Sequence, residues 1–208
     1  MKPLIAALLL ALVAAPAIAG DVVDTSFVKA VGPHVFNVRD LVMMDRVGDP
    51  QLSPDGRYAA FGVRSTDYAA NKGVNAVYVL DLATSDSQPV KVVEKGGSAR
   101  WSADGQSLYF VAPADGVAQL WRLDLGGNGG LNLAKHAAPA QVSHAPLDLG
   151  DYKLSPDGKQ VLLSYDVFTD CATLACTSQR LDARKQDKAS GTLYTKLFVR
   201  QRDRKSVV

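Results

Sequence analysis

Short apolar runs alternate with clusters of turn residues along most of the chain, and this alternation predicts strands. The runs are rich in Val, Leu, Tyr and Phe, which favour strands, and Ser, Pro, Asp and Gly lie between them. The fold class that this pattern indicates is all-β. The predicted strands are Tyr58–Val63, Ala76–Leu82, Val90–Val93, Leu108–Ala112, Gln119–Leu125, Val161–Asp166 and Leu193–Arg200.

One ten-residue pattern occurs three times without gaps, and it predicts a repeat architecture. The copies are Leu52–Phe61, Trp101–Phe110 and Leu154–Leu163. Their glycines are 49 and 53 residues apart, close to the period of about 40 to 50 residues found in propeller blades. The turn residues that the copies share are Ser53, Asp55, Gly56, Ser102, Asp104, Gly105, Ser155, Asp157 and Gly158.

Each copy has the chemistry of a hairpin turn. The serine hydroxyl can cap the turn, aspartate tolerates its position, and glycine supplies the positive φ that reverses the chain. In the first and third copies Pro54 and Pro156 also fix φ at about −65°. A large apolar residue precedes each turn and an apolar run follows it. Each copy is therefore interpreted as a turn between two antiparallel strands.

Further strands after each turn complete units of the size of a propeller blade. The first two units each reach a Leu-Asp-Leu segment, and the first needs six more residues to reach it, which we assign to a loop over Thr66–Asn75. Val90–Val93 supplies a fourth strand in the first unit, and Ala140–Ser143 is the best candidate in the second. The sequence predicts a partial β-propeller of two to three four-stranded antiparallel blades.

The third unit departs from this plan after its second strand. The stretch Thr169–Gly191 holds both cysteines of the chain and the polar run Gln179–Lys188. We interpret the run as a solvated helix or loop inserted in the blade. An arm that reaches toward a substrate pore is the alternative, and the sequence leaves it open.

The first 19 residues have the pattern of a secretory signal peptide. Lys2 precedes an apolar run of 12 residues, Leu4–Ala15, which is too short for the roughly 30 Å of a bilayer core. The small-residue pattern Ala17-Ile18-Ala19 then predicts cleavage after Ala19. We expect a periplasmic or secreted protein with no stable membrane insertion after cleavage; an uncleaved anchor is the alternative. Residues 20–202 would form an incomplete propeller domain.

Export changes the interpretation of the two cysteines. Cys171 and Cys176 are separated by four residues, and nearby thiols in an oxidising compartment tend to pair, so the sequence predicts a disulfide. A closed zinc site needs four ligands, and the three histidines are far away in sequence, so neither a metal nor another cofactor is predicted. The 23 basic and 21 acidic residues give a net charge of +2, which is no excess for binding nucleic acid.

Taken together, these features resemble the N-terminal propeller of exported bacterial serine peptidases of the prolyl oligopeptidase family, in the dipeptidyl or acylaminoacyl peptidase branch. The resemblance rests on the signal peptide, on the opening segment Phe36–Leu41, on Asp170–Cys176 with its polar insertion, and on Thr195–Arg200. It implies short peptides as substrates of the intact enzyme and a propeller that restricts access to the active site. A non-catalytic binding propeller of the TolB kind, which uses the same turn, is the alternative.

The resemblance also implies a following α/β-hydrolase domain with a Gly-x-Ser-x-Gly turn, an Asp and a His. No such turn occurs in these 208 residues, so no catalytic residue is assigned. The nearest segment, Gly97-Ser98, lacks the flanking pattern and is expected in a loop before Trp101.

The last six residues, Asp203–Val208, suggest an artefact tail. Written as the codons GAT CGG AAG AGC GTC GTG, they match a common short-read library adapter, so we expect them to be translated adapter rather than propeller. A natural basic tail is the alternative.

Overall fold

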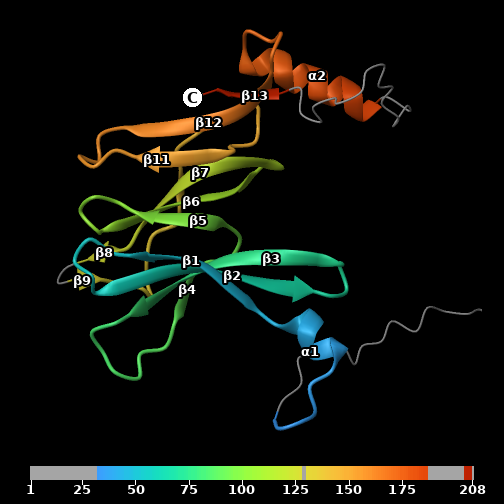
Figure 1. Ribbon diagram of the computed structural model, residues 1–208. Coiled ribbons are helices and arrows are strands. Elements are labelled where there is room, and N and C mark those ends of the chain that lie inside the picture. Colours follow the sequence, from blue (N-terminus) through green and yellow to red (C-terminus); the bar gives the residue numbers. More distant parts are fainter. Residues whose placement is uncertain (1–31, 128–129, 187–203, 208) are drawn as a thin grey trace, which may run out of the picture.

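The structure describes residues 32–127, 130–186 and 204–207, and in this computed structural model they form antiparallel sheets stacked as the blades of a β-propeller (Figure 1). The sheets in this part of the chain are open rather than closed into a barrel. The predicted all-β propeller fold is confirmed. The predicted signal peptide and the predicted strand Leu193–Arg200 lie outside the described residues.

Blade 1 is a four-stranded meander in which each strand pairs with the next one along the chain. Its turn at residues 53–57 connects the first two strands, as the repeat predicts. The fourth strand has the predicted bounds. The strands are β1 (Arg46–Leu52), β2 (Tyr58–Asp67), β3 (Lys72–Asp81) and β4 (Val90–Val93).

The six extra residues of the first unit lie within Thr66–Asn75, as predicted, but the prediction that this segment is a loop is wrong. Strands β2 and β3 continue through most of that segment and pair from Tyr58 with Asp81 out to Asp67 with Lys72. The six extra residues of the first unit make this hairpin two residue pairs longer than its counterpart in blade 2 and its turn two residues longer. Strands β2 and β3 extend past their neighbours here, so their side chains are not buried and need not be apolar. A polar strand of this kind has the same sequence pattern as a loop.

Blade 2 repeats this meander, and a two-stranded ribbon is inserted before its last strand. The last strand is shorter than the predicted Ala140–Ser143. The amides of Val142 and Ser143 both point to the carbonyl of Leu120, so the ladder ends there. The strands are β5 (Gly97–Trp101), β6 (Ser107–Ala114), β7 (Val117–Asp124) and β10 (Ala140–Gln141), with β8 (Gly126–Gly127) and β9 (Gly130–Leu131) as the ribbon.

Blade 3 has three described strands and carries a helix. Strands β11 (Asp151–Leu154) and β12 (Val161–Phe168) form the predicted hairpin, and β13 (Arg204–Val207) pairs with β12. The polar run that we interpreted as a helix or loop falls largely in α2 (Leu174–Gln186), which lies at the outer end of the row in Figure 1. The position of β13 does not test the origin of the tail codons, so the adapter interpretation stays a prediction.

Two apolar clusters hold the three blades together. The first fills the space between blades 1 and 2, and the second fills the space between blades 2 and 3. The fully buried members of the first cluster include Val77, Val79, Leu108 and Leu123, each with no exposed surface. The second is built around Leu120, Leu147, Leu149, Tyr152, Tyr165 and Val167.

A short helix, α1 (Val38–Met43), precedes blade 1. The Asn37 side chain accepts a hydrogen bond from the Arg39 amide at 2.8 Å, and the Asp40 carboxylate accepts one from the Asn37 amide at 2.8 Å. This reciprocal cap was readable from the sequence, although we did not predict a helix here. None of the described helices is long and apolar enough to span a bilayer.

Candidate functional site

The three repeat turns share one hydrogen-bond network. In the first, the Ser53 hydroxyl accepts from the Tyr58 amide at 2.9 Å and donates to the Asp55 carboxylate at 2.5 Å. The same carboxylate accepts from the Arg57 amide at 3.1 Å. Gly56 has φ +71°, a conformation that favours glycine. Blades 2 and 3 repeat these contacts through Ser102, Asp104, Gly105, Ser155, Asp157 and Gly158.

The aspartate of each turn was expected only to tolerate its position, but it also holds the turn together. Its carboxylate accepts both the serine hydroxyl and the amide two residues later. These hydrogen bonds, the serine one foremost, lower the pKa of Asp55, Asp104 and Asp157. The turn network thus depends on an ionised carboxylate.

The turns also contact one another across the blades. A Cβ placed on Gly105 would lie 3.2 Å from Cδ of Pro54 in the preceding turn. A Cβ on Gly158 would lie 3.6 Å from Cβ of Ala103, the residue equivalent to Pro54 in the second turn. One repeat motif therefore closes a hairpin and spaces its blade from the next.

The first strands of blades 1 and 2 carry matching bulges that the sequence analysis missed. Asp49 has φ +52° and Ser98 has φ +53°, and each lies three residues before the apolar residue that opens its turn. Pairing shifts register at both places. A Gly followed by Asp or Ser marks these positions in the sequence and recurs at Gly150-Asp151, where the ladder stays regular. Bulges of this kind re-aim side chains.

The expectation that Gly97-Ser98 lies in a loop is wrong. This segment lies at the start of β5 and not in a loop. The Ser98 backbone carbonyl accepts a hydrogen bond from the Tyr152 hydroxyl at 2.6 Å. Ser98 thus takes part in the contact between blades 2 and 3 through its main chain.

Polar contacts link the first strands of successive blades. The Arg100 guanidinium in blade 2 contacts the Asp49 carboxylate in blade 1 at 2.6 Å, and the Trp101 indole donates to the Gln51 carbonyl at 3.1 Å. From blade 3, the Tyr152 hydroxyl lies 2.6 and 2.8 Å from the carbonyls of Ser98 and Tyr109. Burial raises the pKa of this tyrosine, so the hydroxyl stays a donor.

A cleft of about 500 Å³ opens between blades 1 and 2, at the end of the sheets opposite the repeat turns. Its blade 1 wall includes Lys72, Asn75 and Lys95, and its blade 2 wall includes Pro113 and Gly116. Asp148, on the connection to blade 3, completes the lining and accepts a hydrogen bond from the Ala118 amide at 2.7 Å. The volume is in the range of small-ligand sites.

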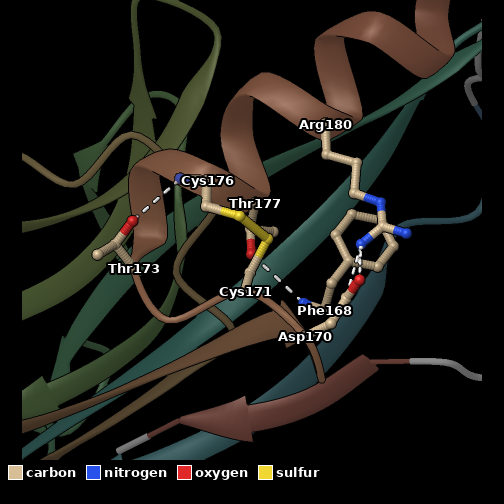
Figure 2. The surroundings of a disulfide bond; sticks show 7 residues. All are labelled: Phe168, Asp170, Cys171, Thr173, Cys176, Thr177 and Arg180. Atoms are coloured by element: carbon tan, nitrogen blue, oxygen red, sulfur yellow. Dashed lines mark hydrogen bonds and ion pairs between the residues drawn. A yellow bond between two sulfur atoms is a disulfide. The ribbon is translucent and has the colours of Figure 1, made fainter.

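The two cysteines stand at the start of the inserted helix and are joined by a disulfide, with Cα atoms 5.6 Å apart (Figure 2). Thr173, between them, accepts a hydrogen bond from the Cys176 amide at 3.2 Å. The hydroxyl of Thr177, which is fully buried, accepts one from the Phe168 amide at 3.3 Å. The bridge and the Thr177 hydrogen bond hold the first turn of α2 at the end of β12, and Thr173 caps the start of the helix.

Beyond its first turn, α2 covers the end of blade 3 with basic side chains. The Arg180 guanidinium contacts both carboxylate oxygens of Asp170 at 2.6 Å (Figure 2). The side chains of Arg180 and Arg184 also lie over the Phe168 ring, at 4.6 and 4.7 Å from its centre. The helix is therefore anchored at its base by the disulfide and along one side by cation–π contacts.

None of the described residues forms a cluster of three or more His, Cys, Asp or Glu that could hold a metal ion. The described part has a charged cleft, polar links between first strands and an anchored basic helix.

Comparisons with known proteins agree with this architecture. No protein-family model matches the sequence. The chain is 27% identical over 127 residues to the uncharacterized peptidase YuxL of Bacillus subtilis, and 26% identical over 161 residues to dipeptidyl-peptidase 5 of Porphyromonas gingivalis. These matches cover 60% and 77% of this chain but only 18% and 21% of the two relatives.

Among solved structures, an acylaminoacyl peptidase of Pyrococcus horikoshii has the same fold over 63% of this chain and 19% of its own, with a TM-score of 0.50 and 18% identity. The chain is related to the propeller part of prolyl oligopeptidase-family peptidases. Blades 1 to 3 of this peptidase-related propeller are the part that the structure describes. The chain spans about a fifth of the length of the curated relatives that it matches.

Proposed function

We propose that the chain is the propeller portion of a serine peptidase that acts on short peptides, and that the propeller restricts which substrates reach the active site. The observation that carries this proposal is the sequence similarity to two peptidases over 60% and 77% of the chain. The relative named dipeptidyl-peptidase 5 supports short peptides as the substrate class.

Restriction by size follows from the rigidity of the blade contacts. Apolar packing and hydrogen bonds join the first strands of blades 1 to 3. A ring built from blades joined in this way would not open easily, because separating two blades exposes an apolar cluster. Extended or short peptides could pass where a folded protein could not.

The chemistry would take place in a catalytic domain of the α/β-hydrolase kind. A serine there would attack the peptide carbonyl with the help of a histidine, and an oxyanion hole would stabilise the tetrahedral intermediate. The contribution of the present chain is to bind and exclude, not to react.

The first experiment is to determine the reading frame of the genomic locus from adapter-free DNA. We expect further blades followed by a Gly-x-Ser-x-Gly segment, an Asp and a His. A frame that contains only more Asp-Gly repeats up to the stop codon would favour the binding propeller of the TolB kind instead.

The second experiment tests restriction on the product of that frame. A dipeptidyl chromogenic substrate should be hydrolysed, and replacing the predicted nucleophilic serine by alanine should abolish hydrolysis. A folded protein substrate should resist cleavage under the same conditions, and rapid cleavage of it would contradict the gating role.

We also propose that the protein is exported and begins at Gly20 after processing, as the apolar run and the Ala17-Ile18-Ala19 pattern suggest. The mass of the protein recovered from the periplasm or medium tests this. A mass that includes residues 1–19 would indicate a retained anchor.

A further inference from the structure

The cleft between blades 1 and 2 has an uneven distribution of charge. Lys72 and Lys95 line its blade 1 side, and Asp148 lies on the connection to blade 3. Neither lysine side chain has a hydrogen bond or ion pair with any residue that the structure describes. Both side chains are exposed at the cleft, so their charges are available to a ligand.

A third cation, Arg64, extends toward the same cleft. Its guanidinium lies over Gly73, a lining residue, so closely that a Cβ on Gly73 would lie 2.8 Å from the guanidinium carbon. Arg64 likewise has no ion pair in the described part of the chain. Its direct partner across the ladder is another arginine, Arg46.

The two arginines that face each other across this ladder gain no ion pair from the described residues. Like charges directly opposite each other on two strands destabilise the pair. Arg46 faces Arg64, and no carboxylate among the described residues is bonded to either of them. The acids nearby already accept main-chain hydrogen bonds, Asp67 from the Ala70 amide and Asp148 from the Ala118 amide. An anionic group in the cleft would relieve the repulsion and would gain from the charge that the walls concentrate.

We propose that this cleft binds the carboxylate group of a short peptide, with Arg64, Lys72 and Lys95 around the carboxylate. The acid on the far side, Asp148, would repel the carboxylate and attract an amino group, so the peptide would lie with its carboxylate toward blade 1. The choice of a peptide as ligand rests on the proposed function, whereas the preference for a carboxylate rests on the cleft itself. Carboxylates suit this set of donors, because arginine and lysine bind them through charge-assisted hydrogen bonds.

The test uses the full 208-residue chain and three dansylated peptides. The peptides are Ala-Ala-Ala-Ala with a free C-terminus, the same peptide as its C-terminal amide, and the amide of Ala-Ala-Asp-Ala. Binding is followed by fluorescence anisotropy. We expect the free acid to bind about tenfold more tightly than the tetra-alanine amide, because the amide cannot form the charge-assisted contact. Recovery of binding by the aspartyl amide would show that any carboxylate suffices, and failure to recover would assign the site to a C-terminus.

Two triple variants separate the cleft from general surface charge. Arg64→Gln combined with Lys72→Gln and Lys95→Gln should make acid and amide bind equally. The matched control, Lys135→Gln with Lys153→Gln and Lys159→Gln, removes the same charge from exposed lysines that do not line the cleft, and it should keep the tenfold preference. Urea unfolding of both variants checks that they are folded.

Equal binding of acid and amide by the unmodified chain would overturn the proposal, and so would a control variant that loses as much preference as the cleft variant. No step requires hydrolysis. A failure here therefore leaves the peptidase proposal standing, and a locus without a catalytic domain leaves the carboxylate result standing.

Discussion

The two interfaces between the blades are held by different interactions. Blades 1 and 2 are joined mainly by apolar packing, whereas blades 2 and 3 combine apolar packing with buried hydrogen bonds. The first is filled by a larger apolar cluster in which Phe110 and Leu108 are almost or fully buried. The second has a smaller cluster, and a tyrosine hydroxyl and a buried glutamine lie inside it. The Gln119 side chain accepts a hydrogen bond from the Ser143 hydroxyl at 2.7 Å and donates one to the Ala145 carbonyl at 2.9 Å.

The difference can be traced to one position of the repeat. Ala99 and Tyr152 stand at the same place, two residues before the apolar residue that opens each turn. Ala99 leaves room that larger side chains of blades 1 and 2 fill, whereas Tyr152 fills its own interface and bonds to carbonyls of blade 2. Apolar burial supplies free energy without direction, and hydrogen bonds to carbonyls fix the position of one blade against the next.

The largest expected effect comes from the apolar interface. Phe110→Ala should lower the free energy of unfolding by about 3–5 kcal/mol, because it removes a buried ring and leaves a cavity. The matched variant is Phe61→Ala, since Phe61 is only half-buried and stacks on Tyr78 on the other face of blade 1. Phe61→Ala should lower the free energy of unfolding much less than Phe110→Ala. Urea unfolding followed by tryptophan fluorescence measures both, and equal losses would contradict the central role of this interface.

The disulfide should affect blade 3 alone. Its short loop limits the stabilisation to about 2 kcal/mol in the chain-entropy treatment. A variant with Cys171→Ser and Cys176→Ser should free the first turn of α2 and raise hydrogen exchange near Phe168, while the interface of blades 1 and 2 keeps its protection. In the unmodified exported protein, mass spectrometry without reductant should give a mass two hydrogens below that of the reduced protein. Equal masses would reject the bridge.

Tyr152→Phe tests the polar interface with little change in volume. The lost hydroxyl leaves the carbonyls of Ser98 and Tyr109 without this donor, and the expected cost is about 1–2 kcal/mol. Hydrogen exchange should rise in β5 and β11 but not between blades 1 and 2. A variant as stable as the parent would show that the aromatic ring of residue 152, and not its hydroxyl, holds these blades together.

The sequence predicted what depends on neighbouring residues. The turn residues, the strands that flank them and the spacing of the blades are local signals, so the fold class followed from them. The contacts of Tyr152 and the cleft with Lys72 and Lys95 could not be predicted, because they join residues that are far apart in sequence. The paired bulges are intermediate, since the Gly-Asp and Gly-Ser pairs before each turn repeat in the sequence but do not reveal a positive φ.

Two glycines distinguish the two roles of the repeat turn. Gly56→Ala places a side chain at φ +71° with no atom within 4 Å, so its cost should be the backbone strain alone, about 1 kcal/mol. Gly105→Ala adds a Cβ 3.2 Å from Pro54 of the preceding blade, and it should cost more. Thermal unfolding of both variants measures the difference. Equal losses would mean that the turns do not space the blades.

The smallest expected effect is a dependence on pH that both interfaces share. The pKa values of Asp55, Asp104 and Asp157 are lowered from 3.8 in the folded protein, first by the serine hydroxyl and then by a main-chain amide. The unfolded chain therefore takes up these protons first as the pH falls. The stabilisation is complete above the unfolded value of 3.8 and is lost as the pH drops through the lower folded values. Because these carboxylates are exposed and solvent screens them, the loss should be small.

A variant with Asn at all three positions checks this. Its unfolding midpoint, measured from about pH 2 to pH 6, should depend less on pH than that of the parent, because three groups that link protonation to unfolding are gone. Hydrogen exchange at low pH should rise at both interfaces together, unlike in Tyr152→Phe, because every blade has the same turn network. An acid response confined to one interface would show that the turns do not act alike, and an unchanged pH dependence would show that other carboxylates govern acid unfolding.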